Sequence, residues 1–572
     1  MVIRSLTGVL IALCCVSSSC GPLPVQEGKP SQVPPTSSGG EAPPVFSFVD
    51  DGVTVESYPV QGSFGSNAGP AISPDGKYIL GTLPGSGSPS VAAFPLQRGL
   101  APIEFAGLPS ATPDTSRIAR LGWVSDTECV FLMDGILPPG GSEGEPGVAV
   151  YQGRVSDGSS RVISFIPGAS CRQGAFYPGE IRGEWLLPGE SKVYLHLRVV
   201  ENAGTYDVWV YRAFWEVDLR SGKARLLKGK LPTYDGLFRA ALTSDGRYFT
   251  YELHEPDRSG IFVLETATCE ERALLPDGLT KSFGPVISPD GRFVAAYVAG
   301  QIKDESGNAA GYDVYPHVDG LRPAAHSLQV VDMIGREMAT VDMGDKVITD
   351  MQWSADSRSL SFQVGTMTKV EAYEYDFGPE SIWMMQWPVA GTMTPLAPVQ
   401  VAAIPDEHES QMQVEQHPTA DGVGVVWSAD QGDLRLSMLD GHTTIIRLNT
   451  EPNPQDGWWR IPPETLGGFA LEWLGDPGRG LTELWLLGSD VSRRVASYSS
   501  PGEFKSEVVA VGAGKVVVYR RTDPPQAGGF LDVFTFTPEY LDQKAWAAKS
   551  PWDRVKAAVA RALPTSAWSI AS

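Results

Sequence analysis

Cysteine is scarce in this chain, and a long hydrophobic run is missing altogether. Of six cysteines among 572 residues, three lie close to the N-terminus, at positions 14, 15 and 20. The other three, Cys129, Cys171 and Cys269, allow at most one internal disulfide, and their spacing matches no zinc site. We expect Cys129 to be a small buried residue of a strand and the other two to lie near turns. No stretch of about 18 apolar residues occurs, which excludes a membrane-spanning helix.

Basic clusters and paired histidines are also missing. The 45 Lys and Arg residues are scattered and are outnumbered by 67 Asp and Glu, which gives a formal net charge of −22. A chain without a basic stripe lacks the electrostatic footprint of a nucleic-acid binder, so we exclude that class of partner. None of the seven histidines has the His-x-His or His-x-x-x-His spacing of a local metal site. The sequence therefore predicts no metal and no cofactor.

What the chain does contain is a recurring short phrase. A Ser or Thr is followed by Pro or a small residue, then Asp, then Gly or Ser, then a basic residue that leads into a β-prone run. The four clear copies are Ser73–Lys77, Thr243–Arg247, Ser288–Arg292 and Ser354–Arg358. Pro presets the turn, Asp accepts a hydrogen bond from the backbone ahead of it, and Gly adopts the positive φ that closes it. The phrase predicts a tight turn at the start of a strand.

Looser copies of the phrase fill the intervals. They lie at Trp123–Asp126, Pro188–Lys192, Pro418–Gly422 and Trp473–Asp476. Measured between their acidic residues, the eight copies are 45 to 66 positions apart. This spacing suits a four-stranded blade whose hairpin loops vary in length.

The repeats resemble the TolB-like, WD40-like (PD40) β-propeller family. The resemblance covers roughly residues 45–540. It implies an all-β fold, with a single β-propeller of about eight four-stranded blades over residues 45–539 and seven blades as the alternative. Residues 508–518 and 530–536 are either a further blade or segments that close the ring with residues 45–60. By analogy alone, the resemblance implies protein partners at the cell envelope, because one fold carries many functions.

The N-terminus carries the features of a bacterial lipoprotein signal. Arg4 supplies a positive charge, residues 8–16 a short apolar core, and residues 17–19 three serines before Cys20. This pattern predicts removal of residues 1–19 and lipidation of Cys20, with an ordinary secretory signal cut near Ser19 as the alternative. The Pro-rich residues 20–44 are expected to form a tether without a core. Gly21 after the cysteine favours the outer membrane, in a host that has one.

The C-terminal segment does not provide a catalytic domain. Residues 540–572 are helix-prone and are expected to form a short cap broken at Pro551. They are too few for the α/β-hydrolase domain that follows similar propellers in prolyl-oligopeptidase-like peptidases. Gly140–Gly144 matches G-x-S-x-G, but flanking prolines prevent the helix that a nucleophile elbow needs. Asp304–Asn308 lacks the spacing of an EF-hand and is interpreted as a solvated loop. No catalytic residue is assigned.

Three long loops are expected on the face opposite the Asp-Gly turns, at residues 134–147, 301–325 and 366–381. The last two belong to consecutive blades and should be neighbours. They carry aromatic residues among carboxylates, a composition typical of recognition surfaces. The candidate binding residues are Tyr312, Asp313, Tyr315, His317, Glu371, Tyr373, Tyr375 and Asp376. The alternative is that these loops pack on each other and cover the mouth of the central channel.

The sequence therefore favours a lipid-anchored, extracytoplasmic β-propeller that binds or scaffolds other envelope proteins. It would contact the membrane through its anchor only. The alternative is an enzyme, a polysaccharide lyase or hydrolase, that draws His and acidic residues from several blades to the propeller axis. A purely structural surface protein is a third possibility. The oligomeric state is not indicated by the sequence.

Overall fold

The computed structural model describes residues 45–541, with gaps between strands; the gaps of eight or more residues are 109–116, 171–183, 405–413 and 448–457. Contacts between residues divide the chain into two units, Met1–Pro43 and Pro44–Ser572, and all the described residues belong to the second unit. The regular elements of the described residues are all β-strands. Among the described residues, no helix has the length and hydropathy of a membrane span. The signal, Cys20, most of the tether and the expected C-terminal cap beyond Leu541 lie outside the described residues.

Nine antiparallel sheets of three or more strands make up the described part of the chain, and the first three follow each other in sequence. The first sheet consists of β3 (Tyr78–Leu83), β4 (Ser90–Pro95) and β5 (Ile103–Glu104). The second consists of β6 (Arg117–Trp123), β7 (Glu128–Ile136), β8 (Gly147–Arg154) and β9 (Ser159–Pro167). The third consists of β10 (Ala169–Ser170), β11 (Glu184–Leu186), β12 (Lys192–Glu201), β13 (Trp209–Asp218) and β14 (Ala224–Pro232).

The next three sheets have four strands each. The fourth consists of β15 (Ala240–Leu242), β16 (Tyr248–His254), β17 (Ser259–Glu265) and β18 (Glu271–Pro276). The fifth consists of β19 (Lys281–Ile287), β20 (Phe293–Ala299), β25 (Ala325–Asp332) and β26 (Glu337–Asp342). The sixth consists of β27 (Val347–Trp353), β28 (Ser359–Glu371), β29 (Glu374–Gln386) and β30 (Val399–Ala403).

The last three sheets include strands from both ends of the described chain. The seventh consists of β31 (Val414–Pro418), β32 (Gly424–Ala429), β33 (Leu434–Met438) and β34 (Thr443–Arg447). The eighth consists of β35 (Trp458–Arg460), β36 (Thr465–Leu466), β37 (Phe469–Asp476), β38 (Leu481–Leu487), β39 (Ser492–Ser499) and β1 (Val45–Val49). The ninth consists of β40 (Phe504–Gly512), β41 (Lys515–Thr522), β42 (Gly529–Phe536) and β2 (Val53–Val60).

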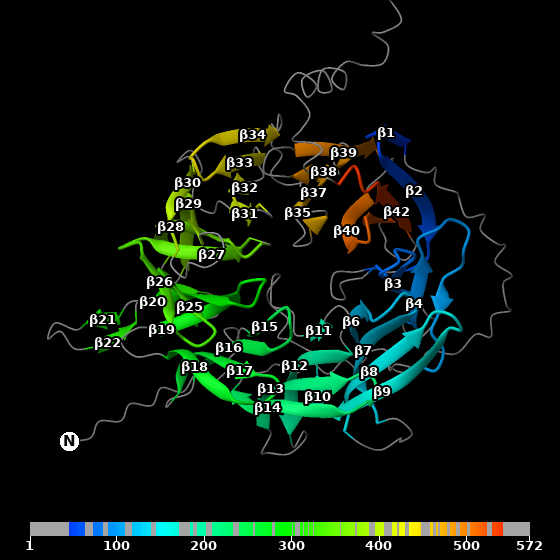
Figure 1. Cartoon of the computed structure of the whole chain (residues 1–572), viewed down its shortest axis with the longest axis horizontal. Helices are drawn as coiled ribbons and strands as arrows, with labels where there is room; N and C mark the ends of the chain where they lie inside the picture. The colour runs from blue at the N-terminus through cyan, green and yellow to red at the C-terminus, as the bar shows by residue number, and fades with distance from the viewer. Residues whose placement is uncertain are drawn as a thin grey trace, which may run out of the picture. The chain divides into compact units, whose positions relative to one another are not determined.

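The sheets stand one after another around a common centre, which confirms the all-β propeller fold (Figure 1). In the second to seventh sheets, six of the eight turn phrases lie in sequence where one strand ends and the next begins. Ser73–Lys77 directly precedes β3, the first strand of the first sheet, and Trp473–Asp476 forms the end of β37 in the eighth sheet. The ninth sheet is the further blade that the sequence left open. Its outer strand β2 pairs with β42, and β1 pairs with β39 in the eighth sheet. The first two strands of the described chain therefore complete its last two sheets.

The turn phrase works as its residue types predict. Ser288 Oγ donates to Asp290 Oδ1 at 2.7 Å and accepts from the Phe293 amide at 3.0 Å, and the Asp290 carboxylate accepts from the Arg292 amide at 3.1 Å. The same set of bonds recurs at the other three clear copies. The glycine of the phrase has positive φ, 69° at Gly291. The Asp residues of these clear copies are therefore turn formers, as expected.

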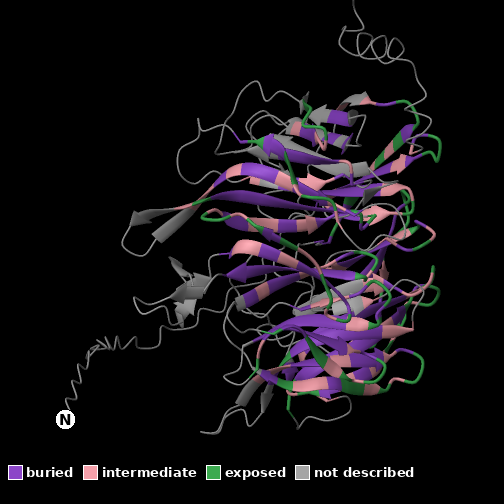
Figure 2. Cartoon of the chain, turned by 60° about the vertical axis from the view of Figure 1, so that its left-hand side comes forward, coloured by how far each residue is buried: buried purple, intermediate pink, exposed green. Residues whose placement is uncertain are grey.

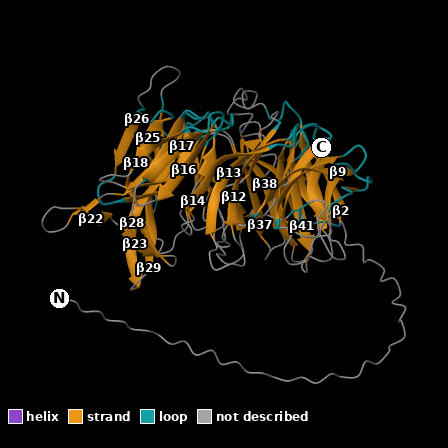
Figure 3. Cartoon of the chain, turned by 90° about the horizontal axis from the view of Figure 1, so that it is seen from below, coloured by secondary structure: helices purple, strands orange, loops and turns teal. Residues whose placement is uncertain are grey.

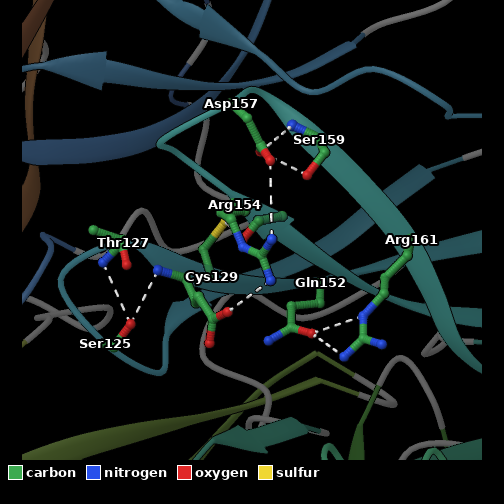
Figure 4. Close-up of polar contacts among 10 residues, drawn as sticks. Ser125, Thr127, Cys129, Gln152, Arg154, Asp157, Ser159 and Arg161 are labelled. Carbon is green, nitrogen blue, oxygen red and sulfur yellow. Dashed lines mark hydrogen bonds and ion pairs between the residues drawn. The ribbon is translucent and has the colours of Figure 1, made fainter.

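A looser copy in the second sheet uses its serine alone. Ser125 Oγ accepts from the amides of Thr127 and Glu128, at 3.3 and 3.1 Å (Figure 4). Cys129, which begins the core of this sheet, is fully buried, and its thiol donates to the Gly153 carbonyl at 3.6 Å. Burial raises the pKa of the Cys129 thiol to about 12, so this cysteine is an unreactive core residue, as predicted.

The hydrophobic core lies between the sheets. Eight clusters of buried apolar side chains each span two neighbouring sheets, and in the described part only the seventh and eighth sheets share none. Phe214 of the third sheet, for example, stacks on Phe249 of the fourth at 4.5 Å. Figure 2 shows the strands largely buried and the exposed residues concentrated in the turns. A single blade could not bury its own faces, and stacking supplies the core.

Turns of neighbouring sheets also bond to each other. Ser244 Oγ donates to the Pro289 carbonyl at 2.6 Å, and the Asp290 amide donates to Ser357 Oγ at 2.8 Å. Lys515 of the ninth sheet donates to the Gly76 carbonyl of the first at 2.8 Å. These bonds fix the face of the propeller that carries the Asp-Gly turns.

Candidate functional site

Two of the predicted long loops are built from strands. Between β20 and β25 the chain forms two small hairpins, β21 (Gln301–Lys303) with β22 (Ala309–Tyr312), and β23 (Val314–His317) with β24 (Gly320–Pro323). Neither hairpin joins the fifth sheet, from which they emerge. We refer to residues 300–324 as the double-hairpin insertion.

The second insertion is a continuation of the sixth sheet rather than a loop. β28 and β29 are 13 residues each and stay paired from Ser359↔Gln386 to Glu371↔Glu374. β27 pairs with β28 only as far as Gly365, and β30 pairs with β29 only from Ser381 onward. The expectation of a loop over 366–381 was therefore wrong, because the β-prone run that follows Ser359 continues beyond the sheet. We refer to residues 366–379 as the hairpin extension.

The side chain of Lys346 binds two residues at the base of the hairpin extension. Lys346 Nζ donates to Thr366 Oγ1 at 2.9 Å and to Glu380 Oε1 at 2.7 Å. Thr366 also bonds to Glu380. The bond from Lys346 lowers the pKa of the Glu380 carboxyl. Because these groups are over a third exposed, the ion pair orients the extension more than it stabilises the fold.

The structure brings the two insertions together. β23 of the double-hairpin insertion contacts β29. Both insertions follow the second strand of a sheet, at the end away from the Asp-Gly turns, and Figure 3 shows β23, β28 and β29 on the side opposite most described loops. The expectation that these segments of consecutive blades are neighbours on one face is confirmed.

The predicted binding residues are distributed over these strands. Tyr312 ends β22, while Tyr315 and His317 lie in β23. Glu371 ends β28, and Tyr375 and Asp376 lie in β29, opposite Lys369 and Thr368. Asp313 and Tyr373 lie outside the described residues, as do Gly140–Gly144, Asp304–Asn308 and Cys171. The adjacency of β23 and β29 thus joins the two groups of candidates at the backbone level.

A second polar region, which the sequence reading missed, lies between the sheets. In the fourth, fifth and sixth sheets, the side chain of the fifth residue of the second strand forms a hydrogen bond with the backbone of the first strand of the next sheet. Glu252 accepts from the Gly284 amide at 3.0 Å, and Tyr297 Oη accepts from the Met351 amide at 3.0 Å. Gln363 Nε2 donates to the Val414 carbonyl at 2.8 Å. These side chains form a polar layer across the fourth to seventh sheets.

The polar layer supports irregular first strands. The register of β19 shifts between Phe283 and Val286, and that of β27 between Thr349 and Gln352. Gly284 and Asp350, inside these two shifts, have positive φ of 61° and 47°. A bulge frees backbone groups from the ladder, and the neighbouring sheet satisfies them.

Asp350 is the only carboxylate of the described chain at a positive φ. Its Oδ1 accepts from Gln352 Nε2 and its Oδ2 from Gln363 Nε2, both at 3.1 Å. Gln416 of β31 donates from Nε2 to the Asp350 carbonyl at 2.6 Å. Desolvation raises the pKa of the Asp350 carboxyl above its usual range. Perturbed carboxylates on strained backbone are common at functional sites, which makes this cluster a second candidate.

Histidines do not assemble into a metal centre in the described residues. His196 is buried in β12 beside Phe214, with ring centroids 4.9 Å apart. His326 bonds through Nδ1 to the Lys346 carbonyl at 3.0 Å, and His442 lies at an exposed turn. Over this part of the chain, no three His, Cys, Asp or Glu side chains are grouped to hold a metal. The described residues therefore contain no His cluster of the kind that an enzyme at the propeller axis would use.

Comparisons with known proteins identify no family for this chain. No family model matches it, and no curated protein matches it either. Among solved structures it is similar to the periplasmic gluconolactonase PpgL of Pseudomonas aeruginosa, with 16% identity and a TM-score of 0.31 over 65% of this chain and 96% of that one. It is similar to TolB of Acinetobacter baumannii, with 9% identity and a TM-score of 0.24 over 69% and 77%. It also resembles oligopeptidase B of Leishmania major, with 10% identity and a TM-score of 0.37 over 73% of this chain, and it spans about half (53%) of that protein.

Proposed function

We propose that this protein is a lipid-anchored propeller of the cell envelope that binds other proteins through the double-hairpin insertion and the hairpin extension. The observation that carries the proposal is the contact between β23 and β29, which joins insertions of two consecutive sheets into one surface. Insertions on one face of a repeat protein are the usual place for recognition, because the remaining fold acts as a rigid support.

The chemistry of the insertions suits a protein partner. The two segments contain four tyrosines, Tyr312, Tyr315, Tyr373 and Tyr375, together with acidic residues. Tyrosine is enriched in protein interfaces because it offers a large contact area with a polar end. The open strand edges of the hairpin extension add backbone groups that an extended segment of a partner can pair with.

A pull-down from envelope extracts tests the binding surface. One variant lacks residues 301–323, and a second replaces residues 366–379 by a two-residue turn. We expect each variant to lose most of the captured partner, while substitution of Ile334, which is 61% exposed in a turn of the other face, leaves capture intact. Unchanged capture by both deletion variants, with normal melting curves, would show that the partner binds elsewhere.

The lipid anchor is a separate part of the proposal and has its own test. Cys20 follows three serines at the end of a short apolar segment, and Cys14 and Cys15 follow bulkier residues. We expect Cys20→Ser to abolish incorporation of a labelled fatty acid and to release the protein from the membrane fraction. Cys15→Ser should leave both unchanged. If the wild-type protein carries no labelled fatty acid and is not found in the membrane fraction, the ordinary secretory signal is supported instead.

A further inference from the structure

One edge of the hairpin extension is an open strand edge. β27 pairs with β28 from Leu360 to Gly365. Beyond that point, Thr366–Glu371 of β28 pairs with β29 alone among the described strands. In an antiparallel ladder, every second residue turns its amide and carbonyl away from the partner strand. β28 therefore presents backbone donors and acceptors along about 20 Å, on the side where β27 would continue. We refer to this side of Thr366–Glu371 as the open edge.

The chain that precedes β27 does not cover the open edge. The Lys346 amide donates to the Met343 carbonyl at 3.2 Å, and the Met343 amide donates to the His326 carbonyl at 2.9 Å. His326 Nδ1 also bonds to the Lys346 carbonyl at 3.0 Å. These bonds hold residues 343–346 to β25 of the fifth sheet. The Lys346 side chain reaches Thr366 at the base of the extension, but the backbone does not continue along β28.

The opposite edge of the extension, along β29, is less suited to pairing. Pro379 has no amide hydrogen, and the register between β28 and β29 shifts next to it. β23 of the double-hairpin insertion contacts β29, and the Ile404 amide donates to the Glu380 carbonyl at 2.8 Å. Along the open edge, by contrast, β28 contains no proline and keeps a regular register with β29 from Thr366 to Lys369. The open edge is therefore the one that can accept another strand.

The two insertions carry an excess of negative charge. Residues 366–379 contain three acidic residues and one lysine, which gives a net charge of −2. Residues 300–324 contain four acidic and two basic residues, which also gives −2. Together the insertions carry −4 over 39 residues, against −22 over the 572 residues of the chain. Charge complementarity steers association and disfavours partners of like charge, so this surface favours a basic segment over an acidic one.

We propose that the partner binds by strand addition, and that an extended segment of it, rich in Lys and Arg, pairs with the open edge. This inference rests on the proposed function and names the kind of partner and the way it is held. The added strand lies in line with β27 and runs antiparallel to β28, as β27 does. In this mode of recognition, main-chain hydrogen bonds supply affinity, and side chains at alternate positions supply specificity.

Fluorescence anisotropy with the full chain and synthetic peptides tests strand addition. The probe is a fluorescein-labelled peptide, Lys-Val-Lys-Thr-Lys-Val-Lys-Thr, and its control has Glu in place of every Lys. We expect saturable binding of the basic peptide and binding of the acidic one that is weaker by about tenfold or more. Two further basic peptides are N-methylated on alternate amides, at the odd or at the even positions. One should bind about tenfold more weakly and the other within about threefold of the unmethylated peptide, because only one edge of the peptide pairs with β28.

Two deletion variants locate the bound peptide. Replacing residues 366–379 by a two-residue turn should abolish binding of the basic peptide. Removing residues 301–323 should keep its affinity within about threefold, because the open edge belongs to β28. Melting curves show whether each variant folds, and the methylated peptides test the proposal on the wild-type chain in either case.

The outcomes separate this proposal from the proposed function. Equal affinity of the two methylated peptides would overturn strand addition, since the basic peptide would then adhere through charge alone. Absence of saturable binding of the basic peptide would overturn it too, and equal binding of the acidic peptide would contradict a basic partner. None of these results changes the pull-down test of the two insertions. If the peptides bind as expected while both deletion variants still capture the envelope partner, the proposed function fails and the open edge remains a site of strand addition.

Discussion

Replacing Asp532 by alanine is expected to lower the free energy of unfolding by about 3–5 kcal/mol, because it leaves a buried guanidinium without its partner. Arg520 and Asp532 are 2% and 0% exposed and lie on neighbouring strands, β41 and β42, of the ninth sheet. Arg520 Nη2 donates to Asp532 Oδ1 at 3.1 Å, and Ser57 Oγ of β2 donates to the same oxygen. Asp532 therefore links side chains of three strands of the ninth sheet, β2, β41 and β42.

Urea unfolding followed by tryptophan fluorescence measures this effect. The matched control is Glu128→Gln, which removes a surface ion pair to Arg154 of 3.5 Å, and it should cost less than about 1 kcal/mol. Ser57→Ala should cost an intermediate amount, about 1 kcal/mol, because it removes one hydrogen bond. If Asp532→Ala costs no more than the control, Arg520 and Asp532 do not form a buried pair that stabilises the ninth sheet.

Acidification from pH 7 to pH 5 is expected to destabilise the protein through two histidines. Burial lowers the pKa of His417 to about 4, and burial together with the Arg212 charge lowers the pKa of His196 to about 3. The ordinary histidine value is about 6.5, so the unfolded chain binds protons below that pH and the folded chain does not. Stability is complete above pH 6.5 and falls as the pH drops, by up to about 1.4 kcal/mol per pH unit for each histidine.

Unfolding free energies at several pH values between 5 and 7 test this account. His417→Gln and His196→Leu should each flatten the pH dependence, and His442→Gln, at an exposed turn, is the control. Each variant is compared with the wild type, because the raised pKa of Asp350 acts with the opposite sign. A slope that is equal in all four proteins would mean that neither His417 nor His196 is kept neutral in the folded protein.

The sequence predicted the repeated parts of the fold because their residues act locally. Ser288 and Asp290 bond within their own turn, so their types alone specify the geometry. The roles of β1 and β2 stayed open because strand partners more than 400 positions apart leave no local signal. Glu252, Tyr297 and Gln363 share one position in the repeat but differ in type, and their purpose is visible only once neighbouring sheets are placed.

The sequence predicted where the candidate site lies in the chain, but not the secondary structure of its two insertions. Length and composition located both insertions, and the order of the repeats made them neighbours. Sequence alone could not show that Thr366 continues a strand, because pairing with Gly378 decides it. Asp350 gave no signal either, since an Asp inside a β-prone run says nothing of a bulge until Gln416 of the next sheet is in place.

Site-specific photo-cross-linking tests the central claim most directly. A photoreactive phenylalanine analogue replaces Tyr315 of β23, Tyr375 of β29 or, on the turn face, Ile334. The account predicts that the first two positions cross-link the same envelope protein and that Ile334 cross-links none. Cross-links from Ile334 alone, with none from Tyr315 or Tyr375, would contradict it.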